Sequence, residues 1–167
     1  MTRPAEGTIF RIDCGAGPGA LGLVSSDPMI VFFHPASYVE DNPYSIVECQ
    51  ELFRVFVENG FWKHKAWQKS GHIELPEYFK VIPYTFKYDV IADRFYRYHH
   101  SAGDLKANIE ECIALEPAAV WSASHITDRL RDSLSGTPNR WLADLRRELV
   151  DAAQVVARPP VQSPGRD

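Results

Sequence analysis

Cysteine is scarce in this chain, and long hydrophobic runs are missing from it. The three cysteines, Cys14, Cys49 and Cys112, lie far apart and form no CxxC pair. Such a sparse, odd set excludes a disulfide framework and a zinc site. The N-terminus shows no apolar signal segment, and no stretch reaches the length of a membrane span. We therefore expect a cytoplasmic protein without a membrane partner.

The chain also lacks the short motifs of common enzymes. It has no GxSxG elbow, no P-loop, and no HxxxH or HxxE spacing among its histidines. The adjacent pair His99-His100 would point to opposite faces of a strand, which makes a shared metal ion difficult. We predict a protein that is not an enzyme and that holds no cofactor and no metal.

Positive charge is scarce in the first part of the chain. Residues 1–60 carry eight acids and three bases, a net charge of −5, whereas residues 61–100 carry seven bases and four acids, a net of +3. Residues 101–167 add eight bases and ten acids, which gives −2 there and −4 in total. An acidic surface disfavours nucleic acid, whose phosphates need Lys and Arg, and suits a basic protein such as a nuclease.

Short apolar runs separated by turn residues dominate the first half of the sequence. The runs 7–13, 20–24 and 29–34 have strand length and predict the meander of a small barrel. The segment 46–57 fits a helix by spacing, but its β-branched and aromatic residues favour a strand. Glu58-Asn59-Gly60 then predicts a hairpin turn, because Asn-Gly tolerates positive φ.

Further strands are expected after this turn, and helices follow them. The predicted strands are 62–69, which returns from the hairpin, then 78–82 and 86–98. A modest helical pattern covers 105–113. A second helix is expected to begin at Pro117 and to end at Gly136.

The clearest helical stripe comes last. Residues 138–157 place Trp141, Leu142, Leu145 and Leu149 along one side of a helix.

These patterns together predict an α+β protein. Its N-terminal part should be β-rich and barrel-like, of the SH3-like type, and its C-terminal part helical. We expect one globular domain over 1–157, with mainly strands in 7–98 and mainly helices in 104–157. The residues 158–167, rich in Pro and polar side chains, should form a disordered tail.

The glycine-rich segment Asp13-Cys14-Gly15-Ala16-Gly17-Pro18-Gly19 suggests an alternative function. It follows an apolar strand and looks like the first motif of S-adenosylmethionine-dependent methyltransferases. Such motifs work because glycines let backbone N–H groups approach a ligand where a helix begins. Here Asp27-Pro28 arrives too early for a helix of sufficient length, so a barrel hairpin is the favoured interpretation.

A second alternative arises from the aromatic and basic segment 61–69. Trp62 and Trp67 with Lys63, Lys65 and Lys69 could stack and neutralise a single-stranded nucleic acid. The acidic character of the other segments favours a half-buried strand with a solvated lysine face instead.

An ordered set of motifs over roughly residues 7–132 resembles a bacterial family of polymorphic-toxin immunity proteins, the immunity protein 26 family. The matching motifs begin with Gly7-Thr-Ile-Phe-Arg-Ile, Ala20-Leu-Gly-Leu-Val, Pro28-Met-Ile-Val-Phe-Phe and Leu52-Phe-Arg-Val-Phe-Val-Glu-Asn-Gly. They continue with Trp67, Gly71, Leu75-Pro76, Glu110-Glu-Cys-Ile-Ala-Leu-Glu-Pro-Ala-Ala-Val-Trp121, His125-Ile126 and Arg129-Leu130.

The resemblance implies a cytoplasmic, β-rich protein that protects its producer by binding a cognate toxin domain. It transfers no catalytic residue to this chain. Family members usually carry a simple polar turn where this chain has Cys14–Gly19, which keeps the methyltransferase alternative open. The helix predicted over 138–157 lies beyond the matching segments.

The residues expected to bind the toxin come from the acidic first part of the chain. Acids there would meet the basic active-site cleft of a toxin, and aromatic side chains nearby would supply anchors. The candidate residues are Tyr38, Glu40, Asp41, Tyr44, Glu48, Glu51 and Glu58. The sequence is compatible with a monomer or a homodimer.

Overall fold

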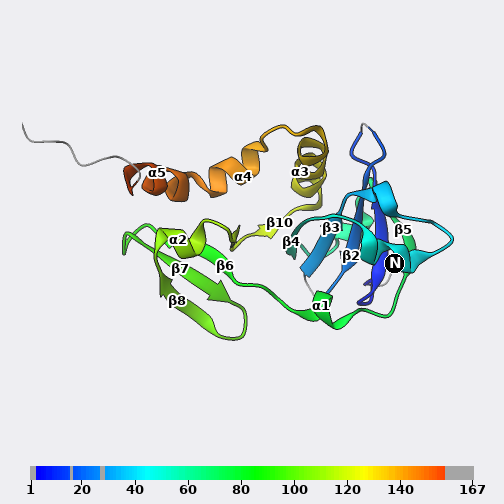
Figure 1. The fold of residues 1–167 in the computed structure, drawn as a ribbon, viewed down its shortest axis with the longest axis horizontal. Helices are drawn as coiled ribbons and strands as arrows, with labels where there is room; N and C mark the ends of the chain where they lie inside the picture. Colours follow the sequence, from blue (N-terminus) through cyan, green and yellow to red (C-terminus); the bar gives the residue numbers. More distant parts are fainter. Residues whose placement is uncertain (1–2, 16, 27–28, 157–167) are drawn as a thin grey trace, which may run out of the picture.

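A computed structural model describes residues 3–15, 17–26 and 29–156, which form two sheets and several helices (Figure 1). The larger sheet has the strand order β10-β4-β3-β2-β1-β5, and the smaller sheet has the order β8-β7-β6-β9. The mixed α+β class is therefore confirmed. The predicted tail 158–167 lies outside the described residues.

The centre of the large sheet is an antiparallel meander of four strands. These are β1 (Thr8–Ile12), β2 (Ala20–Val24), β3 (Met29–Phe33) and β4 (Glu51–Val57). Every residue of β2 and β3 is buried, since both faces of the sheet are covered. The apolar runs of the sequence predicted these strands because a strand buried on both faces needs no polar alternation.

The predicted hairpin between 52–57 and 62–69 is wrong. The next strand, β5 (Trp67–His72), pairs with β1 at the far edge of the sheet and not with β4. Gly60 does take a positive φ of 92°, but it leads into a 3-10 turn, η3 (Phe61–Lys63). The side chain of Phe61 is buried and packs against Phe10 of β1, at a ring-centroid distance of 5.5 Å.

The described strands form open sheets, with no closed barrel among them. The strands β10 (Val120–Trp121) and β5 lie at opposite edges of the large sheet. The pair β10–β4 is parallel and joins Val120 to Phe56 and Trp121 to Val57. A late segment of the chain thus covers the edge that the predicted hairpin would have used.

The small sheet is built from the second half of the chain. Its strands are β6 (Thr85–Asp89), β7 (Arg94–His99), β8 (Gly103–Ala107) and the short β9 (Glu116–Pro117). A buried cluster that includes Phe86, Phe95, Cys112 and Leu149 covers one of its faces. The small sheet therefore has its own core, separate from the two clusters on the faces of the large sheet.

Several predicted boundaries differ from those of the structure. Residues 77–80 form a helical turn, α1 (Glu77–Lys80), where a strand over 78–82 was predicted. The predicted helix 105–113 divides into the end of β8 and the short helix α2 (Ile109–Cys112), which begins at a capping box between Asn108 and Glu111. The part 104–157 therefore also contributes strands.

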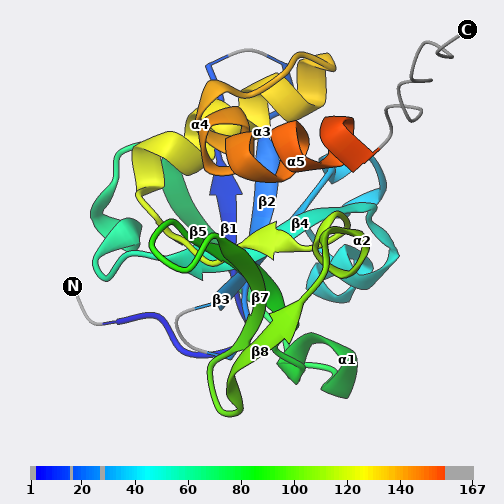
Figure 2. The ribbon, with the colours of Figure 1, turned by 90° about the vertical axis from the view of Figure 1, so that its left-hand side faces the viewer.

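The last helices lie in a row along one side of the molecule (Figures 1 and 2). They are α3 (Ala123–Ser135), α4 (Arg140–Leu145) and α5 (Arg147–Val156). Gly136 ends α3 as predicted, with a φ of 69°.

Two predictions about these helices are wrong. Pro117 does not begin a helix, because it lies in β9 and the cap of α3 is the Ser122 hydroxyl, which accepts the His125 N–H. The single helix predicted over 138–157 is interrupted at Arg146. There the Arg146 guanidinium donates to the carbonyl oxygens of Leu115 and Ile113.

A buried ion pair joins the two sheets. Arg129 of α3 donates to both carboxylate oxygens of Glu116 in β9, at 2.9 and 2.7 Å. Its guanidinium also lies 3.8 Å from the ring centroid of Phe53 in β4 and 4.9 Å from that of Trp121 in β10. The Arg129 side chain is only 6% exposed, so water screens this pair weakly.

We expect Arg129→Met to lower the free energy of unfolding by about 1–3 kcal/mol, because Glu116, which is 25% exposed, would lose its hydrogen-bonded partner. Urea denaturation followed by circular dichroism measures the change. The control is Arg147→Met, whose exposed pair with Asp144 should contribute less than about 1 kcal/mol. Equal effects of the two substitutions would contradict the role of the buried pair.

Candidate partner-binding surface

Five of the seven residues expected to bind a partner lie in one loop between β3 and β4. The loop contains two 3-10 turns, η1 (Pro35–Ser37) and η2 (Pro43–Glu48). We call residues 38–48 the acidic loop. It contains the candidates Tyr38, Glu40, Asp41, Tyr44 and Glu48.

Internal contacts hold the acidic loop in one conformation. The buried Ser45 hydroxyl accepts the Val39 N–H at 2.7 Å and donates to the Asn42 carbonyl oxygen at 2.7 Å. Ile46 is completely buried in the cluster beneath the loop. A loop that is ordered before binding loses less conformational entropy when a partner docks.

The acidic loop also packs on the segment that includes the end of β5. The Tyr38 hydroxyl lies 3.4 Å from the Ser70 hydroxyl, and the Tyr44 hydroxyl accepts the Glu74 N–H at 3.2 Å. Pro43 lies against Gly71, where an added Cβ would come within 3.4 Å of the proline ring. The loop therefore rests on the sheet and does not project freely into solvent.

Apolar side chains are exposed beside the acids of this loop. Val39 is 53% exposed, Tyr44 51% and Val47 44%. Exposed apolar groups next to charge are typical of binding surfaces, where an aromatic anchor supplies much of the affinity. Val39 and Val47 were not predicted as binding residues, because an isolated valine usually indicates a buried position. Only the acidic residues beside them suggest that they are exposed.

The acids of the loop differ in how far they are neutralised. Glu40 pairs with Arg11 at 2.7 Å, in a contact that water reaches on both sides. Asp41 and Glu48 are exposed, and neither forms an ion pair within the described part of the chain. These two carboxylates are therefore the loop charges that a basic partner would meet first.

The remaining two candidates, Glu51 and Glu58, lie outside the acidic loop, at the two ends of β4. Glu51 forms a two-point contact with Arg54, at 2.7 and 2.6 Å, and this hydrogen bonding raises the pKa of the guanidinium. Glu58 follows the other end of β4, where its carboxylate accepts the Ala123 N–H at 3.0 Å. Both carboxylates thus make contacts within the fold, and Glu51 begins β4 three residues after Glu48 of the loop.

The glycine-rich segment forms a different structure from a cofactor-binding turn. It joins β1 and β2, which pair antiparallel from Ile9↔Leu23 to Ile12↔Ala20. A phosphate or methyl-donor motif requires a helix after the turn, and a strand follows here. Gly19 is explained by the hairpin itself, because a Cβ there would come within 2.5 Å of the Ile12 carbonyl oxygen.

The three cysteine side chains are buried. Burial, with a smaller contribution from the charge of Asp13, raises the pKa of Cys14 to about 11. Burial also raises the pKa of Cys49 and of Cys112. A nucleophilic cysteine needs a lowered pKa and access to substrate, so these thiols act as packing groups.

The aromatic and basic segment 61–69 does not present both tryptophans for stacking. Trp67 is only 4% exposed and packs edge-on against Phe10 and Phe32, at centroid distances of 6.0 and 5.8 Å. Trp62 is half-buried, whereas Lys63 is exposed. The segment therefore offers one accessible indole, which weakens the prediction of a single-strand platform.

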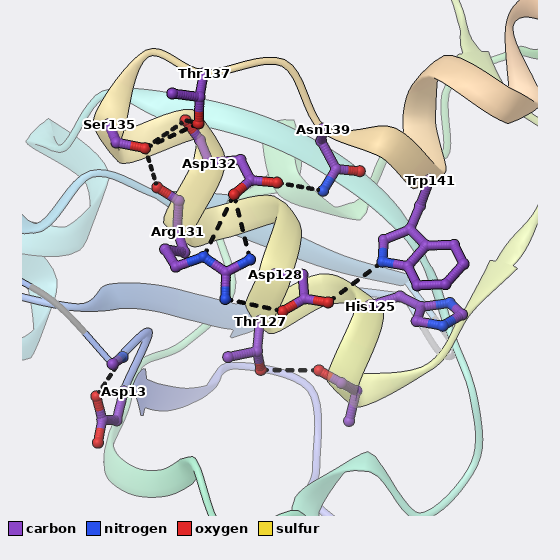
Figure 3. Close-up of polar contacts among 12 residues, drawn as sticks. Asp13, His125, Thr127, Asp128, Arg131, Asp132, Ser135, Thr137, Asn139 and Trp141 are labelled. Atoms are coloured by element: carbon purple, nitrogen blue, oxygen red, sulfur yellow. Dashed lines mark hydrogen bonds and ion pairs between the residues drawn. The ribbon is translucent and has the colours of Figure 1, made fainter.

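A polar network along α3 joins this helix to the start of α4 (Figure 3). Arg131 lies between Asp128 and Asp132, at 3.0 and 3.3 Å. Asp128 accepts the Trp141 indole N–H at 3.3 Å, and Asp132 accepts the Asn139 amide at 2.8 Å. Since each carboxylate is already paired, the network is suited to positioning α4 rather than to acid–base chemistry.

The histidines are also engaged locally. His99 contacts the Ile82 carbonyl oxygen through Nε2 at 3.0 Å and the Ser101 hydroxyl through Nδ1 at 2.9 Å. Within residues 3–15, 17–26 and 29–156, no three His, Cys, Asp or Glu side chains gather closely enough to hold a metal ion.

The chain matches no family model, no curated protein and no solved structure. Among the described helices, none has both the length and the apolar character needed to cross a membrane.

We expect Ser45→Ala to loosen the acidic loop, because the Val39 N–H would lose its acceptor. Amide hydrogen exchange of residues 38–46 should become faster, and the free energy of unfolding should fall by about 1–2 kcal/mol. Ser37→Ala, in the same connection but exposed, serves as the control. Unchanged exchange in Ser45→Ala would show that another contact holds the loop.

We also expect Cys14 to resist alkylation in the folded protein. With a pKa of about 11, only about one Cys14 side chain in a thousand is a thiolate at pH 8. Iodoacetamide labelling at pH 8, read by mass spectrometry, should modify Cys14 only after denaturation. Fast labelling of native Cys14 would overturn its assignment as a packing group.

Proposed function

We propose that this chain is an immunity protein that binds a basic toxin domain, a nuclease in the first instance, and blocks its active site without performing catalysis. The observation that carries the proposal is the acidic loop. It is ordered by Ser45 and Ile46, exposes Tyr44, and carries Asp41 and Glu48 without internal ion pairs among the described residues.

Charge and shape would act at different stages of binding. The carboxylates of Asp41 and Glu48 attract a cleft whose cations normally hold the phosphates of a nucleic acid, and this attraction speeds association. Tyr44 and Val39 then bury apolar surface against the rim of the cleft and slow dissociation. A loop seated in this way excludes the substrate from the cleft.

The motif resemblance supports the same class of function. It covers roughly residues 7–132 and so includes both sheets and part of α3. We also propose that the strands β1–β5 are of the SH3-like type. The support for this type is the order β5-β1-β2-β3-β4, together with the 3-10 turn that precedes β5.

We expect the double charge reversal Asp41→Lys with Glu48→Lys to abolish protection. The test is co-expression with the toxin domains of the producing organism, scored by growth. A toxin that the wild-type chain neutralises is then used in stopped-flow binding. Association at low salt should slow by about ten- to a hundredfold, since steering by opposite charge is lost.

The matched control is Glu110→Lys with Asp151→Lys, which changes the net charge equally on the exposed side of α2 and α5. It should protect as well as the wild type. The proposed surface is wrong if the loop variant also protects with an unchanged salt dependence. The proposed function is wrong if the wild-type chain binds and neutralises none of the toxin domains.

A further inference from the structure

A cavity of about 610 Å³ lies against β1 and β5, on the face of the large sheet opposite the acidic loop. Its aromatic wall consists of Phe10, Trp62 and Trp67. Cavities that bind small molecules usually have volumes of about 300–1,000 Å³ and a largely apolar lining with a few polar groups. The volume and the lining therefore both fit a ligand site.

The pairing of β1 with β5 explains how basic groups reach this cavity. Lys69 lies opposite Phe10 and His72 opposite Thr8, so the paired side chains project from one face of the sheet. The N-terminal segment, with Arg3, lines the same cavity. Helix α3 covers another part of this face through Ile126 and Leu130, and its Thr127 hydroxyl accepts the Trp67 indole N–H at 3.4 Å.

The exposed side chain of Lys69 gives the lining of the cavity a positive charge. No acidic side chain is among the described residues that line it. The chain as a whole carries a net charge of −4, so a cationic lining runs against its composition. An anionic ligand is the natural complement of such a lining.

An unused hydrogen-bond donor lies in the same wall. The indole Nε1 of Trp62 is buried and has no hydrogen-bond partner within the described part of the chain. Leaving a buried N–H without an acceptor is costly, and buried tryptophans normally find one. Because this nitrogen is covered by protein atoms, a ligand in the cavity would meet the indole ring of Trp62 and not its N–H.

We propose that this cavity binds a nucleotide, with the base against Trp62 and the phosphate beside Lys69. An aromatic base suits the indole, because aromatic rings stack on one another. A phosphate suits Lys69, because ammonium–phosphate contacts are strong, charge-assisted hydrogen bonds. The nucleotide is either a free mononucleotide or the end of a single strand, since both present the same chemistry.

The test is isothermal titration calorimetry of the purified full chain with AMP. Adenosine and inorganic phosphate are titrated separately, and each should bind at least about tenfold more weakly than AMP, because each supplies half of the contacts. The proposal is overturned if AMP produces no binding heat at millimolar concentration.

Variants locate the binding in the cavity. Lys69→Gln should weaken AMP binding about tenfold, and Trp62→Ala, which removes the ring on which the base would stack, should weaken it by a similar factor. Lys63→Gln removes an equal charge from the same region outside the cavity lining and should leave AMP binding unchanged. Equal losses in Lys63→Gln and Lys69→Gln would indicate general attraction to basic surface and would overturn the site.

An eight-nucleotide deoxyadenosine strand distinguishes the two sources. Binding by both AMP and the strand, with similar affinity and the same dependence on Lys69, indicates a site for one nucleotide. Much tighter strand binding that still requires Lys69 indicates a strand end. Strand binding without AMP binding contradicts the proposal.

Growth protection against a toxin should stay unchanged in Lys69→Gln, because the acidic loop lies on the other face. Failure of the nucleotide site and failure of the immunity function can therefore be distinguished.

Discussion

The buried guanidinium of Arg129 lies where the large sheet, the small sheet and α3 meet. It stacks on Phe53 and Trp121 and holds the carboxylate of Glu116, so one side chain contacts β4, β10 and β9. The strands β9 and β10 contain two residues each and make few ladder hydrogen bonds of their own. The ion pair therefore fixes a segment that backbone pairing alone would hold weakly, and α3 and the small sheet take their positions from it.

Burial of both faces of the large sheet decides where charged groups lie. Because β2 and β3 have no exposed residue and contain no ionisable side chain, the charges of the large sheet lie on the strands that flank them and on the loops. The acidic loop covers the cluster of Ile9 and Ile46 on one face, whereas Lys69 belongs to the edge strand β5 and faces the other. The apolar centre thus separates the two candidate sites.

The sequence predicted local structure well and long-range pairing poorly. The apolar runs of β1 to β4 and the stop at Gly136 were correct because each depends on neighbouring residues. The predicted hairpin at Asn59-Gly60 is wrong because β5 pairs with β1, a strand far away in the chain. The helix predicted over 138–157 is interrupted at Arg146, whose guanidinium donates to carbonyl groups of a distant segment. The acids of the acidic loop could be grouped from the sequence because they lie within residues 40–48, whereas the cavity is assembled by the register of β1 and β5, which no local pattern encodes.

The parallel pairing of β10 with β4 has a consequence for synthesis on the ribosome. Strands β1 to β5 emerge first and contain the whole antiparallel part of the large sheet, whereas Val120 and Trp121 emerge much later. Until then the edge of β4, with Phe53 and Val55, remains open to pairing with another nascent chain. Fast elongation through the small-sheet segment, or a chaperone that covers this edge, would shorten that exposure, so the yield of folded protein should depend on translation speed between residues 58 and 121.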